Sequence, residues 1–155
     1  MEILNSNKIK FEISGGFAAK IYGSNRRLAD IDIEVKQIDI KRLIPSISGY
    51  LTYGPSKYID RHWKIPTLVT LKYKMQTIDI FGADKTKIFD AKSKRWVSFP
   101  FMIERARNMV IFGVRIPVID RNALISYKSK LARGVDRSDV KELLSDRANA
   151  SKLLQ

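Results

Sequence analysis

Apolar and polar residues alternate over several short segments, and this alternation predicts β-strands. Residues 9–13 (IKFEI) place charged side chains between apolar ones, which is typical of a half-buried strand. Residues 31–35 (IDIEV) repeat the pattern with acids as the polar members. Two hairpins are also expected: strands 67–73 and 76–81 around a turn at 74–75, and strands 109–112 and 115–119 around Gly113.

Helical spacing predicts a second set of elements. A short apolar helix over 17–22 follows the turn Ser14-Gly15-Gly16, and a longer helix over 38–48 contains Pro45, which limits it. Asp120 can cap a helix over 121–132, Gly134 breaks that helix, and Asp136 can cap a last one. Residues 49–64 are expected to be irregular, and residues 82–108 give no clear pattern.

These elements predict an α+β fold, in which a mixed β-sheet is flanked by helices and followed by a C-terminal helical pair. Strands and helices do not alternate strictly, so a doubly wound parallel sheet is disfavoured. No repeat or linker divides the 155 residues. We therefore expect one domain over 1–155, with a sheet-containing core over about 8–119 and helices over about 120–148.

Charge and composition narrow the chemistry. The formal net charge is +13 and the sequence pI is about 10.0, which favours a polyanionic partner such as nucleic acid or nucleotide phosphates. A solvated basic surface is the alternative. The chain has no cysteine and only His62 as histidine, which excludes disulfides, thiolate zinc sites and multi-histidine metal sites. A metal site must therefore use carboxylates, which suit Mg²⁺ or Mn²⁺.

Membrane insertion and export are not indicated. No apolar run approaches the roughly 20 residues that span a bilayer, and the start Met1–Asn5 lacks the basic-then-apolar plan of a signal peptide. We expect a cytoplasmic protein without a membrane partner.

The segment 30–35 (DIDIEV) carries the strongest chemical signal. Residues two apart in a strand share a face, so Asp30, Asp32 and Glu34 are expected to project together. Close carboxylates repel and raise one another's pKa, and divalent cations that clamp a triphosphate relieve the repulsion. An exposed acidic strand face is the alternative. Acids are disfavoured in strands and this chain is strongly basic, so we favour the metal site.

A third acid and a glycine turn complete the candidate chemistry. Asp79 lies between apolar neighbours in 76–81, where an edge-strand polar residue is an equally good interpretation of Asp79 alone. The turn Ser14-Gly15-Gly16 follows a strand and opens a helix, so its backbone N–H groups can approach a phosphate. A glycine pair is weak evidence by itself. Nothing in the sequence supplies Ser14 with a histidine base, which argues against a hydrolase nucleophile.

The order of these motifs resembles the nucleotidyltransferase superfamily, which shares the palm of DNA polymerase β. Its pattern is a strand, a glycine turn, a helix, an Asp-x-Asp strand and a later acid. The stretch 18–30 resembles the branch that contains minimal nucleotidyltransferases, abortive-infection and toxin-type enzymes, and lincosamide-modifying enzymes. In that branch an arginine precedes the first aspartate by four positions, which is Arg26 here. The helix usual before the first strand is at most a stub within 1–7.

The resemblance implies a metal-dependent enzyme that moves a nucleoside monophosphate from a nucleoside triphosphate, such as ATP, to a hydroxyl acceptor. Asp30, Asp32 and Asp79 would bind the metals, and Asp79 would also activate the acceptor. The nucleotide would be bound by Ser14, Gly15, Gly16, Arg26 and Lys128, where Lys128 matches a lysine of the family's C-terminal helices. Asp139 would support that lysine or the metal site.

The basic charge favours RNA such as tRNA as the acceptor, or a protein partner in a toxin–antitoxin pair. The rival hypothesis is a non-catalytic module on the same fold that binds nucleic acid or a partner protein. The basic run 85–95, followed by Trp96, mixes charge with an aromatic as polynucleotide-binding surfaces do. A solvated loop explains that run equally well.

Overall fold

The computed structural model describes the backbone of residues 1–152 and the side chains of residues 1–145. Within that part of the chain the helices are α1 (Glu2–Ser6), α2 (Gly15–Ile21), α3 (Gln37–Ile47), α4 (Arg121–Leu131) and α5 (Gly134–Lys152). The strands are β1 (Phe11–Ser14), β2 (Asp30–Val35), β3 (Leu51–Ile59), β4 (Trp63–Tyr73), β5 (Gln76–Gly82), β6 (Lys87–Asp90), β7 (Arg95–Ser98), β8 (Arg107–Ile111) and β9 (Val114–Val118).

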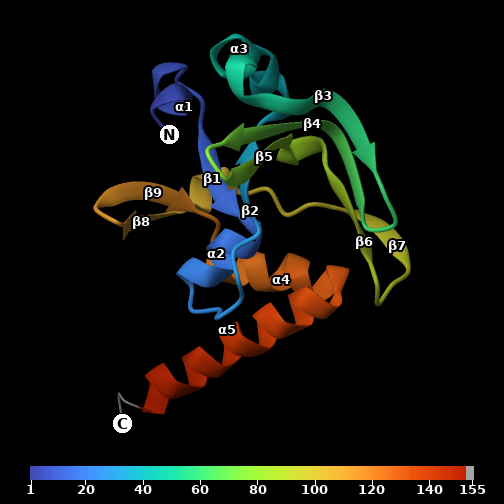
Figure 1. Ribbon diagram of the computed structural model, residues 1–155. Helices are drawn as coiled ribbons and strands as arrows, with labels where there is room; N and C mark the ends of the chain where they lie inside the picture. The colour runs from blue at the N-terminus through green and yellow to red at the C-terminus, as the bar shows by residue number, and fades with distance from the viewer. Residues whose placement is uncertain (153–155) are drawn as a thin grey trace.

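The strands form one mixed sheet in the order β7-β6-β4-β5-β2-β1-β9-β8, with β3 paired to β4. At its centre β2 runs antiparallel to β1 and parallel to β5. Helices α1 and α3 lie on one side of the sheet, and α4 and α5 lie on the other (Figure 1). The α+β fold, the mixed sheet and the two C-terminal helices are therefore confirmed.

The core forms because β2 and β5 turn their isoleucines toward α1 and α3. Ile33 and Ile80 are 8% and 2% exposed, and they pack in one cluster with Leu43 of α3. Burying such side chains contributes roughly 1.5–3 kcal/mol each. The polar members of the same strands consequently face α4, on the other side of the sheet.

Two sequence expectations were wrong, namely the irregular structure of residues 49–64 and the capping role of Asp136. Residues 49–64, expected to be irregular, contain β3 and the start of β4; three register shifts against β4 interrupt β3, so no regular alternation marks it. Residues 82–108, left without a pattern, contain β6, β7 and the start of β8. Asp136, expected as a cap, lies inside α5 and binds side chains instead. Both predicted hairpins are present, as β4–β5 and β8–β9.

No helix among residues 1–152 combines the length and the apolar character needed to cross a bilayer.

Candidate active site

Strand pairing brings the three predicted acids together. Strand β2 pairs in parallel with β5, and in that register Asp32 lies directly beside Asp79. Asp30 lies two residues earlier on the same face of β2. One carboxylate oxygen from each of the three lies within 4.8 Å of those of the other two. The parallel register is thus what unites Asp79 with the pair.

The electrostatics of this group favour a bound cation. Burial, followed by the charges of Asp30 and Asp79, raises the pKa of Asp32 to about 7. Burial and Asp30 also raise the pKa of Asp79, although a hydrogen bond of 2.6 Å from the Thr70 hydroxyl opposes the rise. Three converging carboxylate oxygens are the donor set that Mg²⁺ or Mn²⁺ takes. The residues present therefore fit a divalent metal.

Glu34 does not extend the acidic group, which corrects the sequence expectation. Its side chain is fully buried opposite Glu12 of β1, and none of the four carboxylate oxygens of the two glutamates has a hydrogen-bond partner among the described residues. Burial and the charge of Glu12 raise the pKa of Glu34 well above its usual value. Glu34 does share a face of β2 with Asp32, as the alternation predicted, but at the position of Glu34 this face is buried.

The glycine turn lies directly against the acids. Gly15 has φ of +61°, and a Cβ there would stand 1.7 Å from Oδ2 of Asp32. A Cβ on Gly16 would stand 3.0 Å from Cζ of Arg26. The Gly15 N–H donates to the hydroxyl of Tyr127 at 3.0 Å, which fixes the turn to α4. Glycine is therefore required at position 15, whereas a side chain at position 16 would need only a shift of the Arg26 guanidinium.

Lys128 occupies a different environment from the one expected of a free phosphate-binding lysine. Its side chain is 1% exposed, and its Nζ lies 3.2 Å from Asp136 and 2.9 Å from Asp139. Arg26 binds Asp139 at 3.1 Å, and Arg133 binds Asp136 at 2.6 Å. Three cations and two carboxylates thus form one network beside the glycine turn. Asp139 supports Lys128 in the structure, and it is bonded to the Ser24 hydroxyl as well.

Two cavities meet at the acids. The inner one, of about 180 Å³, is lined by the glycine turn, Arg26, Tyr127 and Lys128. The outer one, of about 470 Å³, is lined by the side chains that β3, the β3–β4 turn and β4 present around Asp79. The cavities share the following residues: Asp30, Asp32, Trp63, Phe81 and Arg133. The three carboxylates therefore lie where a small inner cavity meets a larger outer one.

Sequence reasoning missed several residues of the outer cavity: Tyr53, Tyr58, Asp60, Thr70 and Arg133. The available signal was Tyr53 and Tyr58, two aromatic residues of the segment 49–64 that the missed strand β3 places along one wall of the cavity. Asp60 is held in place because it accepts hydrogen bonds of 2.7 Å from the His62 and Trp63 N–H groups. No pattern in the sequence indicated that Arg133 would lie over the ring of Trp63.

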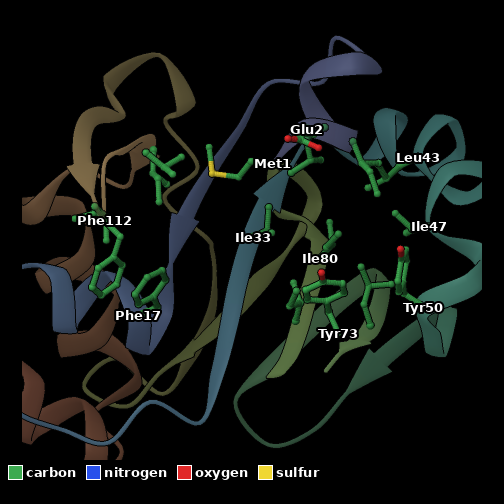
Figure 2. A pocket seen from close by; sticks show the side chains of 17 residues that line it. Met1, Glu2, Phe17, Ile33, Leu43, Ile47, Tyr50, Tyr73, Ile80 and Phe112 are labelled. Atoms are coloured by element: carbon green, nitrogen blue, oxygen red, sulfur yellow. The ribbon is translucent and has the colours of Figure 1, made fainter. Parts of the chain in front are cut away.

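A larger cavity than either of these, of about 670 Å³, is apolar and lies on the opposite face of β2 and β5. Figure 2 shows Ile33 and Ile80 on its floor, with Phe17 and Phe112 on one side and Tyr50 and Tyr73 on the other. It contains none of the three acids. Size alone therefore does not identify the reactive site in this molecule.

No protein-family model matches the chain. No curated protein sequence matches it either. Solved structures do match: the Thermotoga maritima protein TM1012, assigned as a nucleotidyltransferase, superposes with a TM-score of 0.69 at 16% identity, over 94% of this chain and 88% of that one. The lincosamide antibiotic adenylyltransferase LnuA gives a TM-score of 0.58 at 20% identity, over 93% and 91%.

The third match, ANT(2″)-Ia in complex with adenylyl-2″-tobramycin, gives a TM-score of 0.57 at 13% identity, over 99% of this chain and 88% of that one. At these identities the likeness concerns the fold. All three matches cover most of both chains. They confirm, at the level of the fold, the resemblance that the sequence motifs suggested.

Proposed function

From the premise that this chain has the nucleotidyltransferase fold, we propose that it is a metal-dependent nucleotidyltransferase. It transfers a nucleoside monophosphate from a nucleoside triphosphate to a hydroxyl acceptor. The observation that carries the proposal is the convergence of Asp30, Asp32 and Asp79 at the junction of two cavities. A solvated acidic strand face would not be expected to lie where two cavities meet.

The metal is Mg²⁺, or Mn²⁺, held by Asp30, Asp32 and Asp79. When bound there, it neutralises the charge of the triphosphate and of the departing pyrophosphate. The raised pKa of Asp32 supports this assignment. Without a cation nearby this buried carboxylate resists ionisation, and a bound cation would stabilise its charged form. The match of the acids to the metal's oxygen preference supports it independently.

The phosphates of the nucleotide bind in the inner cavity. Ser14, Gly15 and Gly16 supply the close backbone approach there, and Arg26 and Lys128 supply positive charge. Asp136 and Asp139 fix the Lys128 ammonium in one position. Because the lysine cannot swing away, its charge is preorganised toward the phosphates instead of being ordered during the reaction.

The acceptor hydroxyl enters from the outer cavity and meets Asp79. Thr70 donates to one oxygen of Asp79, which leaves the other to take the hydroxyl proton. The acceptor oxygen forms a bond to the α-phosphorus, the bond to the β-phosphate oxygen breaks, and pyrophosphate leaves. The proton passes to Asp79. Nucleoside triphosphates and Mg²⁺ are available in the cytoplasm, where we expect this protein to act.

The proposal is tested with labelled nucleoside triphosphates, Mg²⁺ and an acceptor panel of bulk tRNA, oligonucleotides and small hydroxyl compounds. The wild type is expected to bind a triphosphate and label at least one acceptor, and Asp32→Ala should do neither. Glu104→Ala, which removes an exposed acid away from both cavities, is the matched control and should behave as the wild type. A wild type that binds no triphosphate and labels no acceptor would overturn the proposal. RNA binding that survives Asp32→Ala without any transfer would instead identify a binding module.

A further inference from the structure

Positive charge is concentrated on two neighbouring segments beside the outer cavity. Residues 57–64, which include the β3–β4 turn, and residues 85–95, which include the β6–β7 hairpin, together hold eight lysines and arginines and two aspartates. We call these two segments the basic arm. Strand pairing joins them, because Trp63 and Lys64 of β4 lie beside Ile88 and Lys87 of β6. Figure 1 shows β6 and β7 at the side of the sheet, next to the turn between β3 and β4.

The charge of the basic arm is not neutralised within the described part of the chain. None of its eight cations forms an ion pair with a residue in 1–145. Its two acids are engaged locally: Asp60 accepts from backbone N–H groups and Tyr58, and Asp90 accepts from the Lys92 N–H and the Ser93 hydroxyl. The arm therefore presents free positive charge to a polyanion.

The basic arm borders the outer cavity. Tyr58, Asp60 and Trp63 line the cavity, and they belong to the segment 57–64, which also carries Arg61 and Lys64. The cavity, of about 470 Å³, is within the usual range for a site that holds one small ligand. Tyr53 and Tyr58 offer aromatic faces on which a base can stack, and Lys64 Nζ lies 4.2 Å from the ring centre of Trp96, the residue that directly follows the arm.

We propose that the acceptor is the terminal nucleoside of a single-stranded polynucleotide, with the preceding phosphates lying along the basic arm. This inference rests on the proposed function. The terminal 3′ oxygen bonds to the α-phosphorus of the triphosphate, pyrophosphate leaves, and the hydroxyl proton passes to Asp79, so the strand grows by one nucleotide. A small acceptor would use the cavity but would give no role to the charge outside it. RNA and DNA strands share this chemistry, and the experiment separates them.

The test compares two variants that lose equal charge. Lys87→Gln/Lys92→Gln/Lys94→Gln removes three exposed cations of the basic arm, and Lys41→Gln/Arg105→Gln/Arg115→Gln removes three exposed cations elsewhere. The probes are 20-nucleotide single strands of RNA and of DNA with a fluorescent 5′ end. Each is made with a free 3′ hydroxyl and with a blocked 3′ phosphate. Binding is followed by anisotropy over a salt series, and transfer by lengthening of the strand.

The arm variant should bind the strands about tenfold more weakly at 0.1 M salt, and its log–log salt slope should fall by about 2 in magnitude. Its KM for the strand should rise more than its kcat falls, and the control variant should stay within twofold of the wild type. The blocked strand should bind but accept no nucleotide. Lengthening of RNA alone, of DNA alone or of both identifies the source of the strand.

Equal loss of binding in both variants would show a nonspecific charge effect and overturn the inference. The inference would also be overturned if the wild type labelled small acceptors but neither bound nor lengthened any strand. In that case the proposed nucleotidyltransferase function would still stand. If the wild type does not bind a nucleoside triphosphate, the proposed function itself is wrong. The failure of the inference and the failure of the proposed function are therefore distinguishable.

Discussion

The two faces of the paired strands β2 and β5 are built from alternate residues of the same segments, yet they have opposite roles. One face presents Asp30, Asp32 and Asp79 to the two cavities, and the other presents Ile33 and Ile80 to the core around α1 and α3. The isoleucines stabilise the fold. The carboxylates repel one another, and burial with neighbouring charge raises the pKa of Asp32 and Asp79, so the proposed metal gives a reason for their presence. Substitutions on the two faces should therefore have separable effects.

The largest effect is expected on the acidic face. Asp79→Asn keeps the shape of the side chain but removes the proton acceptor, and it should lower the transfer rate about 10³-fold. Removing one of three repelling carboxylates should leave the free energy of unfolding equal or higher. Rapid-quench assays and urea denaturation measure the two quantities. A variant that unfolds easily while retaining its rate would reverse the assignment of this face.

Lys128→Met is expected to have the next largest effect, and it is an effect on stability. The substitution leaves Asp136 and Asp139 buried without their shared cation, which should cost about 3–5 kcal/mol. Lys130→Met, on the same helix and without an ion pair to any residue in 1–145, is the matched control and should change stability by less than about 0.5 kcal/mol. Equal denaturation midpoints for the two variants would refute the buried network.

The apolar face should respond in the opposite way to the acidic one. Ile80→Ala removes buried methyl groups beside Ile33 and should cost about 3 kcal/mol of folding free energy. Transfer activity per folded molecule should stay within a few-fold of the wild type, because Ile80 points away from both site cavities. Activity corrected for the folded fraction is the measurement. A large residual loss of rate would mean that the two faces are coupled.

The buried glutamates give a pH dependence of the unfolding free energy. Burial and Glu12 raise the pKa of Glu34 in the folded protein, so the folded state holds more protons than the unfolded chain above the unfolded pKa. Stability should therefore fall as the pH rises above about 4.5, with a slope of up to about 1.4 kcal/mol per pH unit from this pair. Glu34→Gln should flatten the profile, and Glu104→Gln should not. An unchanged slope in Glu34→Gln would contradict the assignment.

The smallest predicted effect concerns metal binding. Burial and the neighbouring acids give Asp32 a pKa of about 7 without metal, so protons compete with Mn²⁺ below that pH. The apparent Mn²⁺ affinity should fall up to about tenfold per pH unit below pH 7 and level off above it. Calorimetric titrations at several pH values check this, with Asp32→Asn as the comparison. An affinity independent of pH between 5 and 8 would exclude competition at Asp32.

A feature could be predicted from the sequence when the residues that form it are close together in the chain. Asp30 and Asp32 share a face because they are two residues apart on one strand, and that periodicity is visible in the sequence. Asp79 reaches them through the parallel register of β2 with β5, which no local pattern specifies. Its inclusion in the predicted site depended on the family resemblance.

The parts that the sequence did not predict depend on long-range packing. Glu34 continues the acidic alternation, but it is buried because it lies opposite Glu12 of another strand. Asp136 looked like a helix cap, although its carboxylate binds Lys128 of the preceding helix. Strand β3 was missed because its register shifts remove the alternation that identifies a strand. As a result, Tyr53 and Tyr58 of β3 were not predicted as residues of the outer cavity.

One pair of parallel reactions decides whether the acidic face performs nucleotidyl transfer. The wild type is given a nucleoside triphosphate labelled at the α-phosphorus in one reaction and at the γ-phosphorus in the other, with Mg²⁺ and the acceptor panel. We predict that α-label enters the acceptor and γ-label appears only in pyrophosphate, and that EDTA or Asp32→Asn abolishes both. Transfer of the γ-label to the acceptor, or transfer of either label that survives Asp32→Asn, would contradict a nucleotidyltransferase site at Asp30, Asp32 and Asp79.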